Sequence, residues 1–418
     1  AAKLCQRSQV LWISLTINMQ ERRTETMTQI IKPDHNTPEV ADILRHHLND
    51  YKAEYPLWPE HRKITTDLLN CRTARLGGHI ERCDNCGAVR ITYHSCRNRH
   101  CPKCQHMPRE RWLEKRKNEI LPVSYFHVVF TVPHELNTVI LNNKKVMFNI
   151  LFAAAGRTLL TFGNNELNGK LGFLAVLHTW DQKLKAHFHL HCLVAGGVLL
   201  RNKKEWLPVK NDYLFNEEAL SRVFRGKFME RIKLARKTDS FKFAGQSFGD
   251  FKNRLYAKNW VVSVRDPVKR PEHVLEYLAR YTHRVAIANS RIKKLENGMV
   301  SFTAKNRKKQ TSETITITAV EFIRRFLLHS LPKGFVRIRH YGFMANRIRN
   351  ENLNTIRRIL GVSTSSEKEV TTLEEMMLQL TGTDITICPC CTEGKMQFFA
   401  DIPKGRAGPQ TQLACLLC

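Results

Sequence analysis

The stretch AHFHLHCLVA at residues 186–195 decides the fold that the chain is expected to adopt. Residues two apart on a β-strand point to the same face, so the three imidazoles of this stretch project together and the apolar residues between them point the other way. The residues on the two faces are His187, His189 and His191 on one, and Phe188 and Leu190 on the other. Neighbouring neutral imidazoles are typical of a site for a metal ion or a charged substrate, although a histidine cluster in a core would give the same pattern.

The sequence around this stretch predicts an antiparallel sheet. An apolar run at 172–180 is joined to it by only five residues, DQKLK, which is a hairpin-length connection, and Gly196 with Gly197 is expected to end the second strand. Further strands are expected at 125–132, at 261–264 and in a hairpin at 300–318, and helices at 37–70, 109–119, 144–162, 216–237 and 272–282. The expected fold class is therefore α+β, a central antiparallel sheet with flanking helices, preceded by a small helical, cysteine-rich domain.

The composition points to a nucleic-acid partner. The 418 residues include 67 Lys and Arg against 38 Asp and Glu, a net charge of +29, and 42% of them are hydrophobic, which excludes wholesale disorder. A basic surface without a nucleic-acid role is the alternative. No apolar run approaches the roughly 20 residues that a membrane span needs, so no membrane partner is expected. Residues 1–36 are expected to be a disordered or non-native leader, and a bacterial cytoplasmic location, in contact with the nucleoid, is expected for the rest.

The cysteines are bunched in CxxC pairs, which predicts structural zinc rather than a disulfide frame. Cys83 and Cys86 are separated by 14 residues from Cys101 and Cys104, and these two pairs are expected to form one site. Further cysteines and histidines nearby would allow a second ion; the candidates are Cys71, His79, Cys96 and His100. Cys388 and Cys391 form another candidate zinc pair, with Cys390 making its ligand set ambiguous and with Cys415 and Cys418 as its expected partners.

A second cluster, EYLARYTHR at residues 276–284, places two tyrosines four residues apart on a predicted helix. Tyr277 and Tyr281 therefore share one helix face. Such a pair is more often packing than chemistry, but Arg280 and Arg284 beside it favour a polyanionic substrate. A phenol becomes a useful nucleophile toward a phosphodiester when a divalent ion polarises the phosphate. Histidine strand and tyrosine helix together therefore indicate metal-dependent phosphoryl transfer.

These motifs resemble a known family. The HLH of residues 189–191 is similar to the signature of the HUH single-strand endonucleases, and Tyr277 with Tyr281 is similar to their two-tyrosine motif. Together with the cysteine block, HVVFTVPHEL at 127–136 and LHTW at 177–180, they resemble the rolling-circle transposases of the insertion sequence ninety-one family, over residues 40–345. Phe188 stands where members of that family often have Pro, a departure that touches no ligand.

The resemblance implies a Rep-like HUH nuclease domain that nicks and joins single-stranded DNA with Mg²⁺ or Mn²⁺. It makes His189 and His191 metal ligands and the two tyrosines nucleophiles. The third ligand is not fixed by the motif; His178 is the first choice, because the hairpin brings it beside the histidine strand, and His187, His127 and Gln182 compete with it.

The domains follow from these assignments. A zinc-binding, DNA-recognition domain is expected at 37–120, the nuclease domain at 121–345, and a helical segment, linker and cysteine-rich tail at 346–418. DNA contacts are expected from three basic groups: Arg97, Arg99 and Lys103; Arg280 and Arg284; and Lys305, Arg307, Lys308 and Lys309. The expected function is a transposase acting on element-end and single-stranded DNA. A rolling-circle replication initiator or relaxase is the nearest alternative, and a zinc-dependent DNA-binding regulator without catalysis is a further one.

Overall fold

The computed structural model divides the described part of the chain into two compact units. The residues described are 30–31, 37–117, 119–238, 241–243, 247–270, 273–274, 285–306, 310–362 and 372–405. The main unit contains residues 37–71 and the described residues from 95 to 362. The hairpin unit contains residues 30–31, 72–94 and 372–405.

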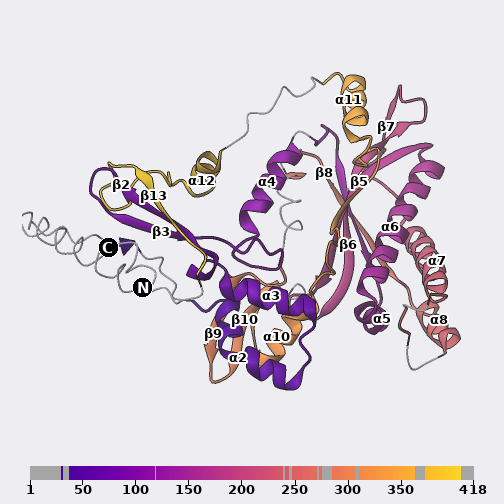
Figure 1. The fold of residues 1–418 in the computed structure, drawn as a ribbon. Helices are drawn as coiled ribbons and strands as arrows, with labels where there is room; N and C mark the ends of the chain where they lie inside the picture. Colours follow the sequence, from indigo (N-terminus) through magenta and orange to yellow (C-terminus); the bar gives the residue numbers. More distant parts are fainter. Residues whose placement is uncertain are drawn as a thin grey trace, which may run out of the picture. The chain divides into compact units, whose positions relative to one another are not determined.

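The main unit is built around an antiparallel sheet in the order β12-β5-β6-β4-β8 (Figure 1). Its strands are β4 (Tyr125–Thr131), β5 (Gly169–Trp180), β6 (Ala186–Leu200), β8 (Val261–Val268) and β12 (Ile338–Gly342), with β7 (Trp206–Pro208) paired to β6. The expected strands and the β5–β6 hairpin are confirmed. The expected end of β6 at Gly196 and Gly197 is wrong, because the strand continues to Leu200. These glycines serve close packing instead: a Cβ on Gly197 would lie 2.4 Å from the Trp206 ring.

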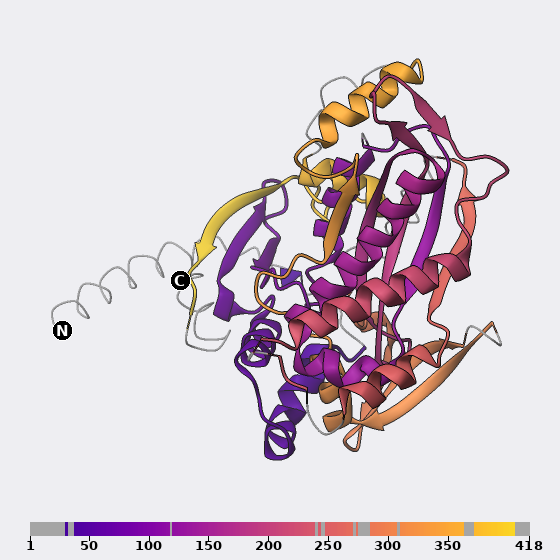
Figure 2. The same cartoon turned by 90° about the vertical axis from the view of Figure 1, so that its right-hand side faces the viewer.

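Helices cover one face of this sheet (Figures 1 and 2). They are α5 (Asn137–Asn142), α6 (Lys144–Glu166), α7 (Glu217–Ala235) and α8 (Phe248–Tyr256), with the short 3-10 turn η2 (His134–Leu136) ahead of α5. The α7 helix begins where the Asn216 side chain accepts a hydrogen bond from the Ala219 N–H, which caps its first turn. Phe224 and Phe228 of α7 pack with Phe130 and Trp260 in the largest hydrophobic core.

The α6 helix is long and apolar enough to cross a membrane by length and composition, although Arg157 interrupts its apolar run. Its most apolar window is 67% buried inside the protein. Phe148 and Phe152, both fully buried, pack against Phe335 and the sheet. Burial of this kind is what a core helix shows, since its apolar side chains already have protein neighbours.

The opposite face of the sheet carries a second, smaller core with α4 (His106–Lys117) and α11 (Arg349–Ile359). Glu119 links the two, because it forms ion pairs with Arg116 and Arg349. The histidines of β5 and β6 lie on this same face, since they alternate with Phe188 and Leu190, which enter the largest core.

The N-terminal helices lie in the main unit. Helices α2 (Val40–Glu54), α3 (Pro59–Asn70) and α10 (Ala319–Leu328) share one core with a three-stranded sheet, as Figure 1 shows. That sheet has the order β11-β10-β9 and contains β9 (Ile292–Glu296), β10 (Met299–Asn306) and β11 (Thr311–Thr318), with the turn η3 (Asn289–Arg291) before it. The hairpin expected at 300–318 is confirmed and gains a third strand.

The hairpin unit joins two segments that are far apart in the sequence. Its sheet has the order β1-β3-β2-β13, made of β1 (Ile30–Ile31), β2 (Gly78–Cys83), β3 (Val89–Tyr93) and β13 (Met396–Ile402). The turn η1 (Ala74–Leu76) and α12 (Leu373–Thr381) complete it. The segment 37–120 was expected to form one domain. Its residues 72–94 lie in the hairpin unit, where β2 pairs with β13, and its other described residues lie in the main unit.

Candidate active site

Two histidines of the HLH stretch project from β6 as expected. His189 and His191 are 8% exposed, and Phe188 and Leu190 between them are buried in the opposite core. His187, at the start of the strand, is exposed. Its carbonyl oxygen lies 3.1 Å from Nδ1 of His189, which suits an Nδ1–H donor.

His178 on β5 completes a cluster of three imidazoles. It is the direct cross-strand partner of His189 and is 5% exposed. One ring nitrogen from each of His178, His189 and His191 lies within 4.8 Å of the others, and the Nε2 atoms of His189 and His191 are 3.0 Å apart. The Trp180 ring stacks on His178, with centroids 5.1 Å apart. We refer to these three histidines as the histidine cluster.

The other candidates for a third ligand lie elsewhere. His127 of β4 is buried and has its Nε2 atom 2.8 Å from Nδ1 of His191, on the side of that ring away from His189. Gln182 lies in the β5–β6 turn, where its carbonyl accepts a hydrogen bond from Arg291. The sequence indicates His127 only as one of the competing third ligands. Its position beside His191 depends on the pairing of β4 with β6.

The donor set of the cluster suits a divalent ion. Neutral imidazoles are good ligands for first-row transition ions, whereas Mg²⁺ prefers oxygen ligands. Three imidazole nitrogens within 4.8 Å of one another surround a space of the size that such an ion needs. The β5–β6 turn holds the two strands in register, because Oδ1 of Asp181 accepts hydrogen bonds from the N–H groups of Lys183 and Lys185.

Three rows of side chains cross the face of the sheet that carries the cluster, since paired residues of antiparallel strands share a face. Read from β8 to β5 they are Val261, Thr131, His189 and His178; Ser263, Val129, His191 and Val176; and Arg265, His127, Leu193 and Leu174. From the histidines toward β8 these side chains become accessible: Thr131 and Ser263 are half-buried, Val261 is 61% exposed and Arg265 is exposed. The rows form an accessible strip beside the cluster, which we call the β8 strip (Val129, Thr131, Val261, Ser263 and Arg265).

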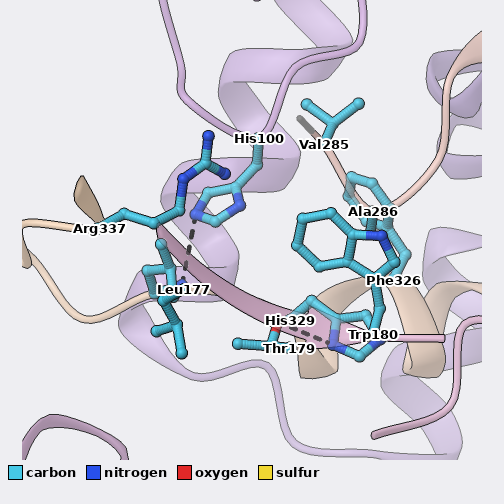
Figure 3. Close-up of a pocket in the computed structure, with 10 residues that line it drawn as sticks. His100, Leu177, Thr179, Trp180, Val285, Ala286, Phe326, His329 and Arg337 are labelled. Atoms are coloured by element: carbon cyan, nitrogen blue, oxygen red, sulfur yellow. Dashed lines mark hydrogen bonds between the residues drawn. The ribbon is translucent and has the colours of Figure 1, made fainter. Parts of the chain in front are cut away.

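A pocket with both polar and apolar lining lies at the end of β5 (Figure 3). Thr179 and Trp180 line it together with His100, His329 and Arg337. His329 is fully enclosed, and burial lowers its pKa to about 4. Its Nε2–H donates to the Leu184 carbonyl, and its Nδ1 atom accepts from the Thr179 hydroxyl.

His100, expected as a zinc candidate, points into this pocket instead. Its Nε2 atom accepts a hydrogen bond from the N–H of Leu331. Burial, helped by the nearby charge of Arg99, lowers its pKa to about 3. The ring is therefore neutral and already engaged, and it is not among the residues that the structure groups as metal ligands.

The described cysteines form two sets of four, but their members differ from the sets that the sequence predicted. Cys101 and Cys104 lie with Cys71 and Cys96, and Cys83 and Cys86 lie with Cys388 and Cys391. The prediction that Cys83 and Cys86 share one site with Cys101 and Cys104 is wrong. Cys71 and Cys96 complete the set of Cys101 and Cys104, and Cys388 and Cys391 complete the set of Cys83 and Cys86.

The first set contains four thiols at the distances that zinc requires. The Sγ atom of Cys104 lies 3.4 Å from that of Cys71 and 3.6 Å from that of Cys96, and Cys101 Sγ is 3.6 Å from Cys71 Sγ. Tetrahedral Zn²⁺ with Zn–S bonds of about 2.3 Å places its sulfurs about 3.8 Å apart. The neighbouring Cys101 thiol lowers the pKa of Cys71 to about 7. The sequence indicates Cys71 and Cys96 only as candidate ligands of a second ion, whereas here they share a set with Cys101 and Cys104.

The expected DNA-binding residues differ in accessibility. Arg97 and Lys305 are exposed, whereas Arg99 donates to the Phe335 carbonyl and Lys103 forms an ion pair with Glu39. The expected nucleophiles Tyr277 and Tyr281 and the basic residues Arg280, Arg284, Arg307, Lys308 and Lys309 lie outside the described residues. The same holds for Cys415 and Cys418, and for most of the helix expected at 272–282.

Comparisons with known proteins define the class of the chain as a transposase. A family model described as "Transposase zinc-binding domain" matches residues 43–132, and one described as "Putative transposase" matches residues 172–352. The chain is 41% identical over 387 residues to "Putative transposase y4qJ" of Sinorhizobium fredii (strain NBRC 101917 / NGR234), a match that covers 89% of this chain and 97% of that protein.

A second relative matches at lower identity. The chain is 24% identical over 321 residues to "Transposase for insertion sequence element IS801" of Pseudomonas savastanoi pv. phaseolicola, covering 72% of this chain and 74% of that protein. A solved "Conjugative Relaxase TrwC in complex with mutant OriT Dna" matches at a TM-score of 0.22 and 13% identity, over 57% of this chain and 75% of that one. The chain belongs to the insertion sequence ninety-one family of transposases and carries that family's zinc-binding domain.

Proposed function

We propose that this transposase nicks and rejoins single-stranded DNA at the ends of its element through a 5′-phosphotyrosine intermediate, and that this chemistry drives rolling-circle-type transposition. The observation that carries the proposal is the histidine cluster, in which His178, His189 and His191 meet on the central strand pair of the sheet. A divalent ion bound there would polarise the scissile phosphodiester and offset the charge that develops on it.

The proposed nucleophiles are Tyr277 and Tyr281, named on the strength of the motif YLARYTHR at 277–284. The tyrosine oxygen bonds to phosphorus and loses its proton, while the bond from phosphorus to the 3′-oxygen breaks and that oxygen takes up a proton. The products are a 5′-phosphotyrosine and a free 3′-hydroxyl. Because the phosphodiester energy is conserved, a 3′-hydroxyl reverses the step and joins strands without a nucleotide cofactor.

The ligand chemistry favours Mn²⁺ over Mg²⁺ at the cluster. All three donors are imidazole nitrogens, and Mg²⁺ binds oxygen donors in near-octahedral geometry. His127 supports the assignment of His191 as a ligand, since it engages the nitrogen of that ring that faces away from the cluster.

We place the single strand over the β8 strip. A phosphate at the cluster lies beside Thr131, and the next positions outward are the half-buried Ser263 and the exposed Val261. Apolar and hydroxyl side chains suit sugar and base contacts, and Arg265 at the end of the strip suits a phosphate. The other basic residues, among them Arg97 and Lys305, would contact element-end DNA elsewhere. We place this reaction in the bacterial cytoplasm, where the element's DNA is part of the nucleoid.

The test is to incubate the protein with a labelled single-stranded element end and Mn²⁺ and to map any covalent adduct by mass spectrometry. We expect an adduct on Tyr277 or Tyr281, and none in the variant carrying Tyr277→Phe and Tyr281→Phe. Tyr213→Phe, at an exposed tyrosine, is the matched control and should form the adduct normally. An adduct of unchanged yield in the double variant would overturn the assignment of the nucleophiles.

A further inference from the structure

The hairpin unit brings together four thiols from its two segments. Cys83 Sγ lies 3.7 Å from Cys391 Sγ, and Cys86 Sγ lies 3.7 Å from Cys388 Sγ. These distances are too long for disulfides, which need about 2.05 Å, and close to the roughly 3.8 Å between sulfurs on tetrahedral zinc. The family's zinc-binding region at 43–132 contains only the first two of these cysteines.

The two cysteine turns are built alike. In the first, the Cys86 N–H donates to Cys83 Sγ at 3.4 Å and the Gly87 N–H donates to the Cys83 carbonyl. In the second, the Cys390 N–H donates to Cys388 Sγ at 3.4 Å and the Thr392 N–H donates to the Cys388 carbonyl. Gly87 and Thr392, which follow the second ligand of each turn, both have positive φ, 71° and 59°. Backbone N–H groups aimed at sulfur stabilise the thiolate that zinc binds.

The pairing of β13 with β2 places the two cysteine turns next to each other. Met396 of β13 pairs with Cys83 of β2, and just beyond this pair the Asp84 N–H donates to the Lys395 carbonyl while Oδ1 of Asp84 accepts from the Lys395 N–H. Gly394 lies so close to the first turn that a Cβ there would be 2.5 Å from Cys83 Sγ. The approach of the two segments is therefore specified by strand pairing and by a glycine.

The described residues of the hairpin unit contain two small apolar clusters. One joins β2, β3 and β13 through Ile80, Val89 and Ile402. The cluster around the thiols consists of Cys83, Ala88, Cys388 and Met396, with Cys391 packed against it. Three of its five members are themselves candidate ligands. Units with so little core are stabilised by metals or disulfides, and structural zinc supplies folding free energy directly.

We infer that Cys83, Cys86, Cys388 and Cys391 bind a second structural zinc ion, and that this ion fastens the C-terminal segment 372–405 to the β2–β3 hairpin. Cys86 of the first turn and Cys388 of the second are 302 residues apart in the sequence. The C-terminal segment is thus a required part of the module that carries the hairpin. Zinc binding at these four cysteines does not require the proposed nuclease chemistry.

The test is to measure the number of zinc ions bound per purified full chain by elemental mass spectrometry. We expect two zinc ions per chain in the wild type and one in the variant carrying Cys388→Ser and Cys391→Ser. Cys390→Ser is the matched control, because Cys390 is exposed and outside the set, and it should keep both ions. A wild type with one zinc, or a double variant that keeps two, would overturn the inference.

A second measurement uses only the wild type and does not require the variant to fold. Iodoacetamide is added with and without a zinc chelator, and the alkylated cysteines are identified by peptide mapping. Cys388 and Cys391 are expected to react only after chelation, while the exposed Cys390 reacts in both samples. Equal alkylation of Cys388 and Cys391 in the two samples would contradict a zinc ion bound there.

Discussion

Nε2 of His127 lies 2.8 Å from Nδ1 of His191, and the two rings are nearly parallel, with centroids 5.0 Å apart. The other nitrogen of His191 faces His189. When Nδ1–H of His191 donates to Nε2 of His127, Nε2 of His191 presents its lone pair to the cluster. In the proposed site, His127 would therefore orient His191 through this contact.

Replacing His127 with Ala should weaken divalent-ion binding about 10–100-fold, because the ring of His191 loses the partner that orients it. Titration calorimetry with Mn²⁺ measures this directly, without relying on nicking. His187→Ala, at an exposed histidine outside the cluster, is the control and should bind Mn²⁺ as the wild type does. Unchanged affinity in His127→Ala would show that the contact does not support the ligand.

Replacing Cys71 with Ser should remove one zinc ion and lower the melting temperature, since Cys71 supplies a thiol to the set with Cys96, Cys101 and Cys104. Metal analysis and thermal unfolding by circular dichroism check the two effects. Cys192→Ala is the control, because Cys192 is buried in the core of the sheet and belongs to neither thiol set. Retention of all zinc by Cys71→Ser would remove Cys71 from the ligands.

Replacing Arg265 with Ala should raise the KM for a single-stranded substrate several-fold and leave kcat nearly unchanged, because the residue lies on the β8 strip away from the cluster. If Arg265 contacts one phosphate, the plot of the logarithm of the DNA-binding constant against the logarithm of the salt concentration should have a slope smaller in magnitude by about 0.7 in the variant than in the wild type. Arg222→Ala on α7 is the control, since it changes an exposed arginine on the helix that covers the opposite face. Equal KM values for the two variants would place the strand elsewhere.

The free energy of unfolding should decrease as pH falls from 7.5 to 5, with His329 contributing about 2 kcal/mol of the decrease. Burial lowers the folded pKa of His329 from 6.5 to about 4, so the unfolded chain binds the proton first over that interval. Denaturant unfolding at several pH values measures how the free energy of unfolding changes with pH. His329→Gln should be less stable at pH 7.5 but show a shallower decrease; a slope equal to that of the wild type would assign the acid sensitivity to other groups.

The central strands of the main sheet and the histidine cluster follow from local sequence features, whereas β12 was not predicted. Apolar runs predicted β4 and β5, and alternation predicted the two faces of β6. The five-residue connection at 181–185 limited the register of the hairpin enough to bring His178 beside His189. Short-range patterns of this kind carry the information for both the strand and its neighbour.

The thiol sets and the role of His127 depend on contacts between distant segments. A CxxC spacing specifies a turn with two ligands, but it does not specify which other turn shares the ion, and Cys86 finds Cys388 through the pairing of β13 with β2. The position of His127 beside His191, 64 residues away, likewise depends on the register of β4 with β6. Non-local strand pairing is not encoded in residue spacing, so these features required the structure.

All three histidines of the cluster lie within one β-hairpin, residues 178–191, whose turn is held by the Asp181 carboxylate. A slip of one residue in strand pairing moves every side chain of a strand to the opposite face. A one-codon insertion or deletion in this turn would therefore turn His189 away from His178 while leaving the reading frame open and the motif intact. The length of this turn is therefore constrained together with the histidines, because it limits the register that places His178 opposite His189.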